Sequence, residues 1–291
     1  TNGDAPFTDL PLQMAASGFV AATVTDSVGN TSELSNCIAV VTDEATYTVD
    51  TNNDDSPDVC ALGSCTLREA ILAANGDSTA STIEFDLSDP VIDLASALPA
   101  ITQPVTIDGT SQAPGTVSIN GGLAGIADGF ELAPGSGGSS VGELVLHDFN
   151  AGAGVRIHSS NNTVQGMTLF DMDDGIVVES GAGNLIGGSF AGGAGNRIWE
   201  TVLSGIELDS AGPGNIVAGN TIGIGGEDQA AGGEFGIQVL ATPGAVIGYG
   251  VGPDGLGTIT GDGFDRANVV VGGNGEVGTG ISIASGSSGT I

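Results

Sequence analysis

Three aspartates in the phrase Phe170-Asp-Met-Asp-Asp-Gly175 form the densest group of side chains that could do acid–base chemistry: Asp171, Asp173 and Asp174. A glycoside hydrolase needs paired carboxylates, and a polysaccharide lyase needs acidic Ca²⁺ ligands with a lysine or arginine base. The chain has no lysine, which leaves Arg156 and Arg197 as bases on neighbouring repeats, and His147 and His158 have no ligand spacing. Because the aspartates precede a glycine at a predicted turn, where solvated acids are common, we expect no catalytic residues.

A second acidic segment, Asp50-Thr-Asn-Asn-Asp54, has the residue types of a metal loop. Asp50, Asn52 and Asp54 occupy positions 1, 3 and 5 of a calcium loop. Asp55 replaces the glycine expected at position 6, and Ala61 stands where the bidentate glutamate of an EF-hand belongs. The sequence leaves two interpretations, a looser Ca²⁺ site made by Asp50, Asn52 and Asp54, or a solvated acidic turn.

The charge of the chain limits its partners. It has 35 acidic residues against 4 arginines, for a net charge of −31. Such a chain repels phosphate backbones and acidic glycans, so nucleic acid is excluded as a partner and cations such as Ca²⁺ are favoured. A hydrophobic content of 40% argues against disorder. No run approaches the roughly 18 apolar residues of a membrane span, so we expect no membrane insertion.

One helix is predicted, at 66–75. Thr66-Leu-Arg-Glu69 is a capping box, in which the threonine hydroxyl accepts from the glutamate N–H and the glutamate carboxylate reaches back. An apolar face then follows at helical spacing, and Asn75-Gly76 ends the helix. The residues of that face are Leu67, Ala70, Ile71 and Ala74.

Two cysteines precede this helix. Cys60 and Cys65 are close enough for a small-loop disulfide, which would favour an oxidising compartment, and two reduced thiols are the alternative. Cys37 is left over. The sequence starts at Thr1, without an initiator Met and without the basic and apolar regions of a signal peptide. We therefore take the sequence as a processed or excised piece.

An internal repeat covers the chain from Gly129 onward. The phrase Gly-apolar-x-apolar begins at Gly129, Gly154, Gly175, Gly205, Gly236 and Gly280. A second phrase follows eight to ten residues later, as at Asn162-Thr-Val164, Asn184-Leu-Ile186 and Asn215-Ile-Val217, and a third fits several repeats. Short strands with one apolar face cannot bury that face alone. We therefore expect an all-β parallel solenoid with three short strands per coil.

The asparagines of the second phrase share the face of the following Val or Ile. We interpret Asn162, Asn184 and Asn215 as a stacked asparagine ladder at an inward corner, where amides satisfy turn backbone and each other. Ordinary turn preference is the alternative. A β-sandwich is the alternative fold, but it needs hairpin turns every 8–12 residues, and the glycine-rich excursions 187–195 and 223–233 resemble loops on one flank.

Three segments follow from these patterns. Residues 1–43 alternate apolar and polar side chains through Phe19–Thr25 and have a second short strand near Cys37–Val41, so they predict a short antiparallel β segment. Residues 44–100 form an N-terminal cap with a strand, the acidic loop, the helix and the first coil strands. Residues 101–291 form the parallel coils. A helix just before the coils would cover the apolar core and the unpaired backbone groups that the first coil would otherwise expose to solvent.

The cap segment resembles a known family. Tyr47–Asn75, "YTVDTNNDDSPDVCALGSCTLREAILAAN", is similar to the CSLREA-domain family of secreted bacterial and archaeal proteins, with Cys65-Thr-Leu-Arg-Glu-Ala70 as the hallmark and Thr66 in place of serine. The resemblance covers about 45–291 and implies a right-handed, pectate-lyase-like β-helix on a large surface protein. Residues 24–37, "VTDSVGNTSELSNC", resemble the tail with which such modules end.

These observations predict a non-catalytic extracellular structural protein, a module of a cell-surface fibre, filament or adhesin. Its expected partners are copies of itself or neighbouring modules, joined end to end, and a host or matrix glycan or protein. The alternative is a glycan-binding or glycan-cleaving module, which would need aromatic platforms. Aromatic residues are sparse, with Trp199, Tyr47 and Tyr249 besides the phenylalanines.

Overall fold

The structure is a computed structural model that describes residues 18–20, 23, 25, 28–32, 38–40, 44–54, 59–188, 194–225, 232–248, 268–270, 279–284 and 287–290. The chain divides into two compact units, Thr1–Glu44 and Ala45–Ile291. The division lies one residue from the predicted boundary at 43. The predicted boundary between 100 and 101 falls inside the second unit, because the cap and the repeats share one core.

The first unit contains two short antiparallel strands, β1 (Gly18–Val20) and β2 (Ile38–Val40). Thr25 and Thr31 form an isolated antiparallel bridge. Both pairings are antiparallel. Cys37 lies outside the described residues.

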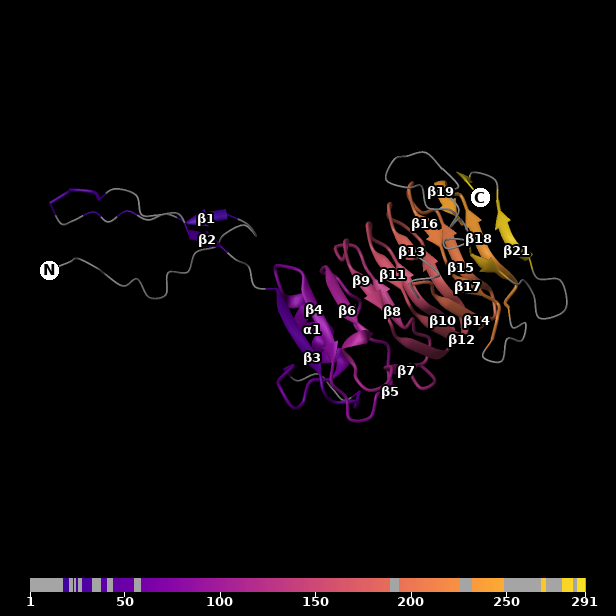
Figure 1. Ribbon diagram of the computed structural model, residues 1–291, viewed down its shortest axis with the longest axis horizontal. Coiled ribbons are helices and arrows are strands. Elements are labelled where there is room, and N and C mark those ends of the chain that lie inside the picture. The colour runs from indigo at the N-terminus through magenta and orange to yellow at the C-terminus, as the bar shows by residue number, and fades with distance from the viewer. Residues whose placement is uncertain are drawn as a thin grey trace. The chain divides into compact units, whose positions relative to one another are not determined.

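The second unit is built from two parallel sheets (Figure 1). One sheet has nine short strands that pair in chain order, and we call it ladder A. Its strands are β3 (Ala45–Val49), β4 (Ser81–Phe85), β6 (Val105–Asp108), β9 (Ser140–Gly142), β11 (Thr163–Gln165), β13 (Leu185–Gly187), β16 (Ile216–Ala218), β19 (Pro243–Ile247) and β22 (Ser288–Thr290).

The other sheet has eleven strands, which fall into two ladders. Ladder B contains β5 (Val91–Asp93), β7 (Ser118–Asn120), β14 (Arg197–Thr201), β17 (Thr221–Ile222) and β20 (Val269–Val270). Ladder C contains β8 (Phe130–Leu132), β15 (Ser204–Asp209), β18 (Phe235–Leu240) and β21 (Thr279–Ile283). The long strands β10 (Val145–Ile157) and β12 (Thr168–Val178) pass through both ladders.

From β9 onward the chain visits ladders A, B and C in the same order on every pass. We call each pass a repeat and each bend between ladders a corner. The three strand positions per repeat agree with the three phrases found in the sequence. All strand pairs in the two sheets are parallel, so the hairpin connections of a β-sandwich are not present among the described residues of this unit.

The core consists of apolar rows that run across the repeats. Each strand alternates buried and outward side chains, and the parallel register stacks buried positions directly on one another. In ladder A the row is Ile83, Ile107, Val141, Val164, Ile186, Val217 and Ile247, all essentially buried. In ladder C, Val155, Ile176, Ile206 and Ile237 form a similar row. Burial of a continuous row is what holds neighbouring repeats together.

The helix α1 (Leu67–Gly76) begins one residue after its predicted start because Thr66 is the N-cap. Its predicted apolar face, Leu67, Ala70, Ile71 and Ala74, is buried in the same core as the strand rows. The helix contacts β3 and β4, at the beginning of ladder A. Asn75 holds its far end, because the side-chain amide donates to Ala100 O and accepts from Thr102 N–H.

Replacing Ile176 with alanine tests the row packing. Ile176 is fully buried between Val155 and Ile206, so Ile176→Ala should lower the free energy of unfolding by about 2–5 kcal/mol. Gln238 lies on the outward face of the same ladder, and Gln238→Ala should change it by no more than about 0.5 kcal/mol. Urea denaturation measures both. If both substitutions lowered the free energy of unfolding equally, the inward position of Ile176 and the outward position of Gln238 would be contradicted.

Candidate functional site

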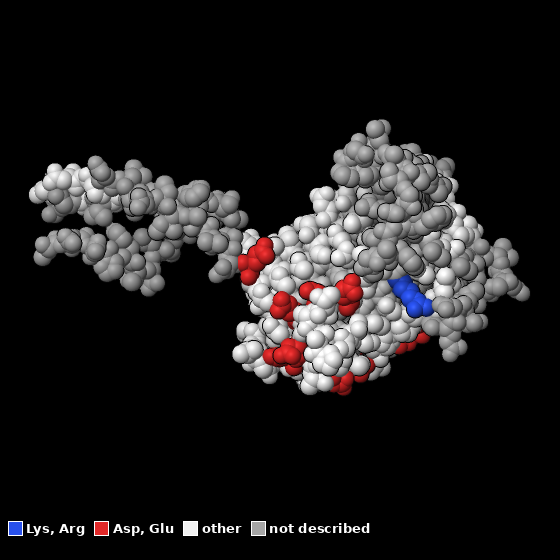
Figure 2. Space-filling view, viewed as in Figure 1, with Lys and Arg blue, Asp and Glu red and all other residues white. Residues whose placement is uncertain are grey.

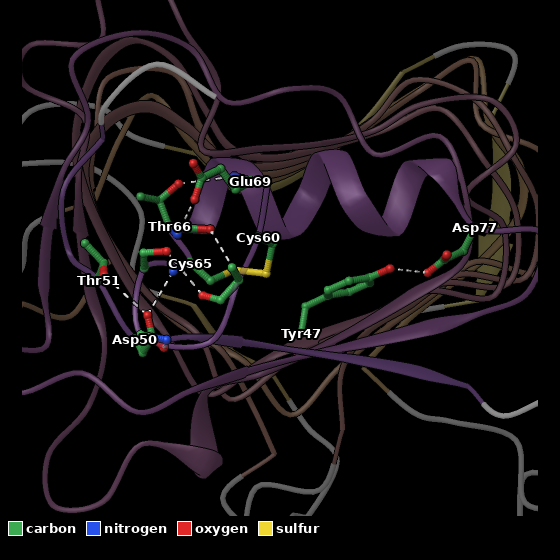
Figure 3. The surroundings of a disulfide bond; sticks show 11 residues. Tyr47, Asp50, Thr51, Cys60, Cys65, Thr66, Glu69 and Asp77 are labelled. Atoms are coloured by element: carbon green, nitrogen blue, oxygen red, sulfur yellow. Dashed lines mark hydrogen bonds between the residues drawn. A yellow bond between two sulfur atoms is a disulfide. The ribbon is translucent and has the colours of Figure 1, made fainter. Parts of the chain in front are cut away.

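The cysteines and the capping box lie at the beginning of the second unit (Figure 3). Cys60 and Cys65 form a disulfide, which agrees with the pairing suggested by their spacing. Thr66 Oγ1 accepts from the Glu69 N–H at 3.2 Å, and Glu69 Oε2 accepts from the Thr66 N–H at 2.9 Å. Both halves of the capping box are therefore made, and the start of α1 is fixed beside a covalent link.

The three candidate calcium ligands serve other groups. Asp50 Oδ1 accepts from the Cys65 N–H at 2.9 Å, and its other oxygen accepts from the Gly63 N–H. Asn52 donates its side-chain amide to Val91 O at 3.0 Å. Asp50 and Asn52 are therefore each engaged with a different part of the chain. Among the residues that the structure describes, no group of three or more His, Cys, Asp or Glu side chains is arranged to hold a metal ion.

Asp54 is the anionic partner of Arg68. Arg68 Nε and Nη2 donate to the two oxygens of Asp54 at 2.8 and 2.7 Å, and the guanidinium also donates to Ser96 O and Ala97 O. Asp54 additionally accepts from the Ala95 N–H. Both side chains are largely buried. This ion pair therefore ties the acidic loop to the helix and to the segment after β5.

Separating the Arg68–Asp54 pair should be costly. Arg68→Ala leaves a buried carboxylate without its cation, so we expect the free energy of unfolding to fall by about 3–5 kcal/mol. Arg68→Lys should lose less of the free energy of unfolding than Arg68→Ala, but it should remain less stable than the wild type. An ammonium group lacks the planar guanidinium that donates to Asp54 and two carbonyls together.

A double-mutant cycle with Asp54→Ala, followed by urea denaturation, isolates the coupling between the two side chains. The losses of unfolding free energy in the two single variants should add up to more than the loss in the double variant. Simple additivity would mean that the two side chains act independently.

The predicted asparagine ladder occupies the corner between ladders C and A. Asn184 Oδ1 accepts from both the backbone N–H and the side-chain amide of Asn162, at 2.8 and 2.9 Å. Asn215 Oδ1 accepts from the same two groups of Asn184, at 2.8 and 2.9 Å. All three side chains are buried. An amide both donates and accepts, so identical residues can stack on successive repeats with every polar atom bonded.

A second asparagine ladder, not anticipated from the sequence, occupies the corner between ladders A and B. Asn220 Oδ1 accepts from the backbone and side-chain N–H groups of Asn196, and Asn268 Oδ1 accepts in the same way from Asn220. The signal was present in the sequence, because each of these asparagines also opens an Asn-x-apolar phrase. Two of the three corners are therefore closed by the same amide chemistry.

Removing the middle amide tests the first ladder. Asn184→Ala leaves the backbone and side-chain N–H groups of Asn162 without their acceptor. Since each buried unsatisfied group costs about 1–3 kcal/mol, the free energy of unfolding should fall by at least about 2 kcal/mol.

Asn161 is the matched control, because it is exposed and has a left-handed backbone that glycine adopts freely. Asn161→Gly should change the free energy of unfolding by no more than about 0.5 kcal/mol. If Asn184→Ala were equally neutral in urea denaturation, the ladder would have no structural role.

The third corner, between ladders B and C, carries carboxylates instead of amides. We call Asp148, Asp171, Asp174, Glu200 and Glu207 the acidic corner. Asp148, Asp171 and Glu200 have left-handed backbones, with φ of 63°, 58° and 53°, and the register stacks them on β10, β12 and β14. Loss of hydration, a hydrogen bond with Asp148 and the charge of Asp148 all raise the pKa of Asp171, and the nearby His147 opposes them.

Two members of the acidic corner are less accessible. Asp174 is 8% exposed and accepts from the Ser204 N–H at 2.9 Å. The Ser204 hydroxyl donates to Glu207 Oε2 at 3.3 Å. Burial raises the pKa of Asp174, although the Ser204 N–H and Arg156 act in the opposite direction. Burial, followed by the charge of Asp174, raises the pKa of Glu207.

An aromatic stack stands beside the acidic corner on the outer face of ladder B. The rings of His147 and Phe170 are stacked with centroids 5.1 Å apart, and those of Phe170 and Trp199 with centroids 4.8 Å apart. The Arg197 guanidinium lies 5.2 Å from the centroid of the Trp199 ring. Both faces of the Phe170 ring are therefore covered by its neighbours, whereas a sugar platform needs an open ring face.

The charged groups of the chain are mostly acidic. On the face shown in Figure 2, acidic groups are spread over the described part of the chain and basic groups are confined to a small area. Arg156 donates to both Asp128 and Glu179. Arg197 donates to Gly225 O at 2.7 Å. The three described arginines therefore all donate to protein acceptors.

The structure separates the residues that the sequence grouped. Asp171 interacts with Asp148, whereas Asp174 is bonded to Ser204. His147 contacts Ser118 Oγ and Asp148 Oδ2, and His158 lies 3.8 and 3.7 Å from Glu131 and Glu179. The acidic corner itself was missed, although a signal exists. An aromatic residue followed by an acid recurs as His147-Asp148, Phe170-Asp171 and Trp199-Glu200.

No protein-family model matches the chain. No curated protein matches it either. The helix that the structure describes is too short to cross a membrane.

Proposed function

We propose that the protein is a non-catalytic structural module of an extracellular fibre, filament or adhesin, and that its second unit is a right-handed parallel β-helix of the CSLREA-domain family. The observation that supports this most strongly is the axial order of the repeats. Apolar rows in ladders A and C and two asparagine ladders run through successive repeats in register. This arrangement gives a stiff rod, because each repeat bonds only to its neighbours along one axis.

In this proposal α1 covers the beginning of the rod. Its apolar face joins the core, and its start is fixed by the disulfide, the capping box and Arg68. At the last described repeat, Ile281 and Ile283 continue two buried rows but are 36% and 42% exposed. A neighbouring module or a second copy would cover them, so end-to-end contact is the expected mode of association.

The disulfide supports an oxidising, extracellular setting, in which such bonds persist. Nothing in the described surface favours the glycan-binding or glycan-cleaving alternative. The aromatic side chains of the stack cover one another, and the aspartates of 170–175 have separate partners. Acidic glycans and nucleic acids are disfavoured by the net charge of −31.

Electron microscopy and sedimentation of the purified chain at low and at moderate ionic strength test the proposal. Like-charged copies repel one another, so fibres should form only where salt screens the charge. Their axial repeat should equal the length of one rod. Dispersed single rods at every salt concentration would contradict self-association and favour a binding module.

A variant that lacks residues 1–43 is the matched comparison, because the second unit begins at Ala45. If the first segment covers the last repeat of the preceding copy, this variant should remain as single rods where the full chain forms fibres. Fibres from both proteins would mean that the joint lies elsewhere.

A further inference from the structure

A serine, a histidine and an aspartate are joined by hydrogen bonds on the outer face of ladder B. Ser118 Oγ lies 3.1 Å from His147 Nε2, and His147 Nδ1 lies 2.6 Å from Asp148 Oδ2. Ser118 comes from β7, and the other two residues come from β10, which pairs with it. A hydroxyl, an imidazole and a carboxylate in this order are the arrangement that activates serine nucleophiles on unrelated folds.

The carboxylate decides which nitrogen of the neutral imidazole can take up a proton. An ionised carboxylate only accepts hydrogen bonds, so His147 Nδ1 carries the hydrogen that is donated to Asp148. In a neutral ring Nε2 is then the acceptor, and the hydrogen of its 3.1 Å contact belongs to the Ser118 hydroxyl. The Ser118 proton is therefore directed at the nitrogen that would remove it.

The imidazole ring is also held on one face. It is stacked on Phe170 with centroids 5.1 Å apart and an interplanar angle of 7°, and Phe170 is stacked on Trp199 in turn. Only 19% of the His147 side chain is exposed. Stacking on one face and hydrogen bonds at both nitrogens keep this base at the distance that proton transfer needs.

The backbone around Ser118 limits what this serine can do. In serine proteases the N–H of the nucleophile helps to bind the oxyanion, whereas the Ser118 N–H donates to Pro90 O at 2.8 Å. Both the attack on an acyl group and its later release by water pass through that oxyanion, and losing one donor costs about 10²–10³ in rate. We therefore expect reaction with strongly activated acyl groups and no turnover of ordinary esters or amides.

The neighbours of Ser118 indicate the kind of acyl donor. Val91 on β5 and Val145 on β10 occupy the paired positions on either side of Ser118. Val91 is 40% exposed. Apolar neighbours favour an apolar acyl group, and the net charge of −31 disfavours donors that carry phosphate or carboxylate groups.

We propose that Ser118 is an activated nucleophile that accepts one acyl group from an uncharged, activated ester, with His147 as its base and Asp148 positioning His147. Ser118 Oγ forms the new ester bond to the acyl carbon, while the bond from that carbon to the leaving alcohol breaks. His147 Nε2 takes the hydroxyl proton and passes it to the leaving oxygen. This modification site goes beyond the structural role proposed above and is compatible with it, because each chain reacts once.

Labelling with para-nitrophenyl acetate and with a fluorophosphonate probe tests the site at about pH 8, where histidine is ordinarily neutral. The wild-type chain should release about one equivalent of nitrophenolate, and peptide mapping by mass spectrometry should find the acetyl or phosphonyl group on Ser118. Ser118→Ala should abolish the label. His147→Gln should slow labelling by at least about 100-fold, since a general base contributes about 10²–10⁴ in rate.

Ser140→Ala is the matched control, because Ser140 is also a partly exposed serine on the outward face of a short strand, β9 in ladder A. It should keep the wild-type labelling rate, and circular dichroism of each variant checks that the fold is retained. Labelling of several serines in proportion to their exposure, or an unchanged rate in His147→Gln, would overturn the proposal. Release of nitrophenolate that continues well beyond one equivalent would contradict a single acylation.

Discussion

Parallel strands that stack in register place each side chain directly against its counterparts on the repeats before and after it. A residue at a corner must therefore be compatible with its own kind at a spacing of roughly 4.8 Å. Asparagine meets this condition because its amide both donates and accepts, and two corners use it. An ionised aspartate or glutamate only accepts, so at the third corner an outside donor such as the Ser204 N–H is needed, and it bonds to Asp174. The same geometric constraint allows identical residues to stack at two corners and requires donors from other residues at the third.

Much of this architecture could be predicted from the sequence because periodic residues report their stacking directly. The glycine and asparagine phrases indicated three strand positions per repeat, and Asn162, Asn184 and Asn215 were recognised from their matched places. The helix was predictable because its capping box is local in sequence. The acidic corner was not, because the register that opposes Asp148 to Asp171 depends on loop lengths between repeats. The bond from Ser204 to Asp174 joins residues 30 positions apart, and no local pattern specifies it.

The acidic loop shows that residues typical of a metal loop can also bind donors of the protein itself. Asp50 and Asp54 have the spacing of calcium ligands, but their oxygens accept backbone N–H groups and the Arg68 guanidinium. Backbone donors and an arginine supply the same positive potential that a cation would. The difference between the two outcomes depends on segments far away in sequence, since Arg68 also reaches the carbonyls of Ser96 and Ala97. The acidic residue types indicate that this loop binds a positively charged or hydrogen-bond-donating group. They do not indicate which group it is.

The bonding of the described arginines affects how readily proteases can cleave the chain. Trypsin-like enzymes cut after lysine or arginine and need that side chain, with its backbone, to fit into their own cleft. This chain has no lysine. Arg68, Arg156 and Arg197 are bonded to acids or carbonyls of neighbouring segments and lie in strands or a helix whose backbone is already paired. Cleavage after any of these three requires the repeats to come apart first, so the rate of digestion there would follow the opening of the stack.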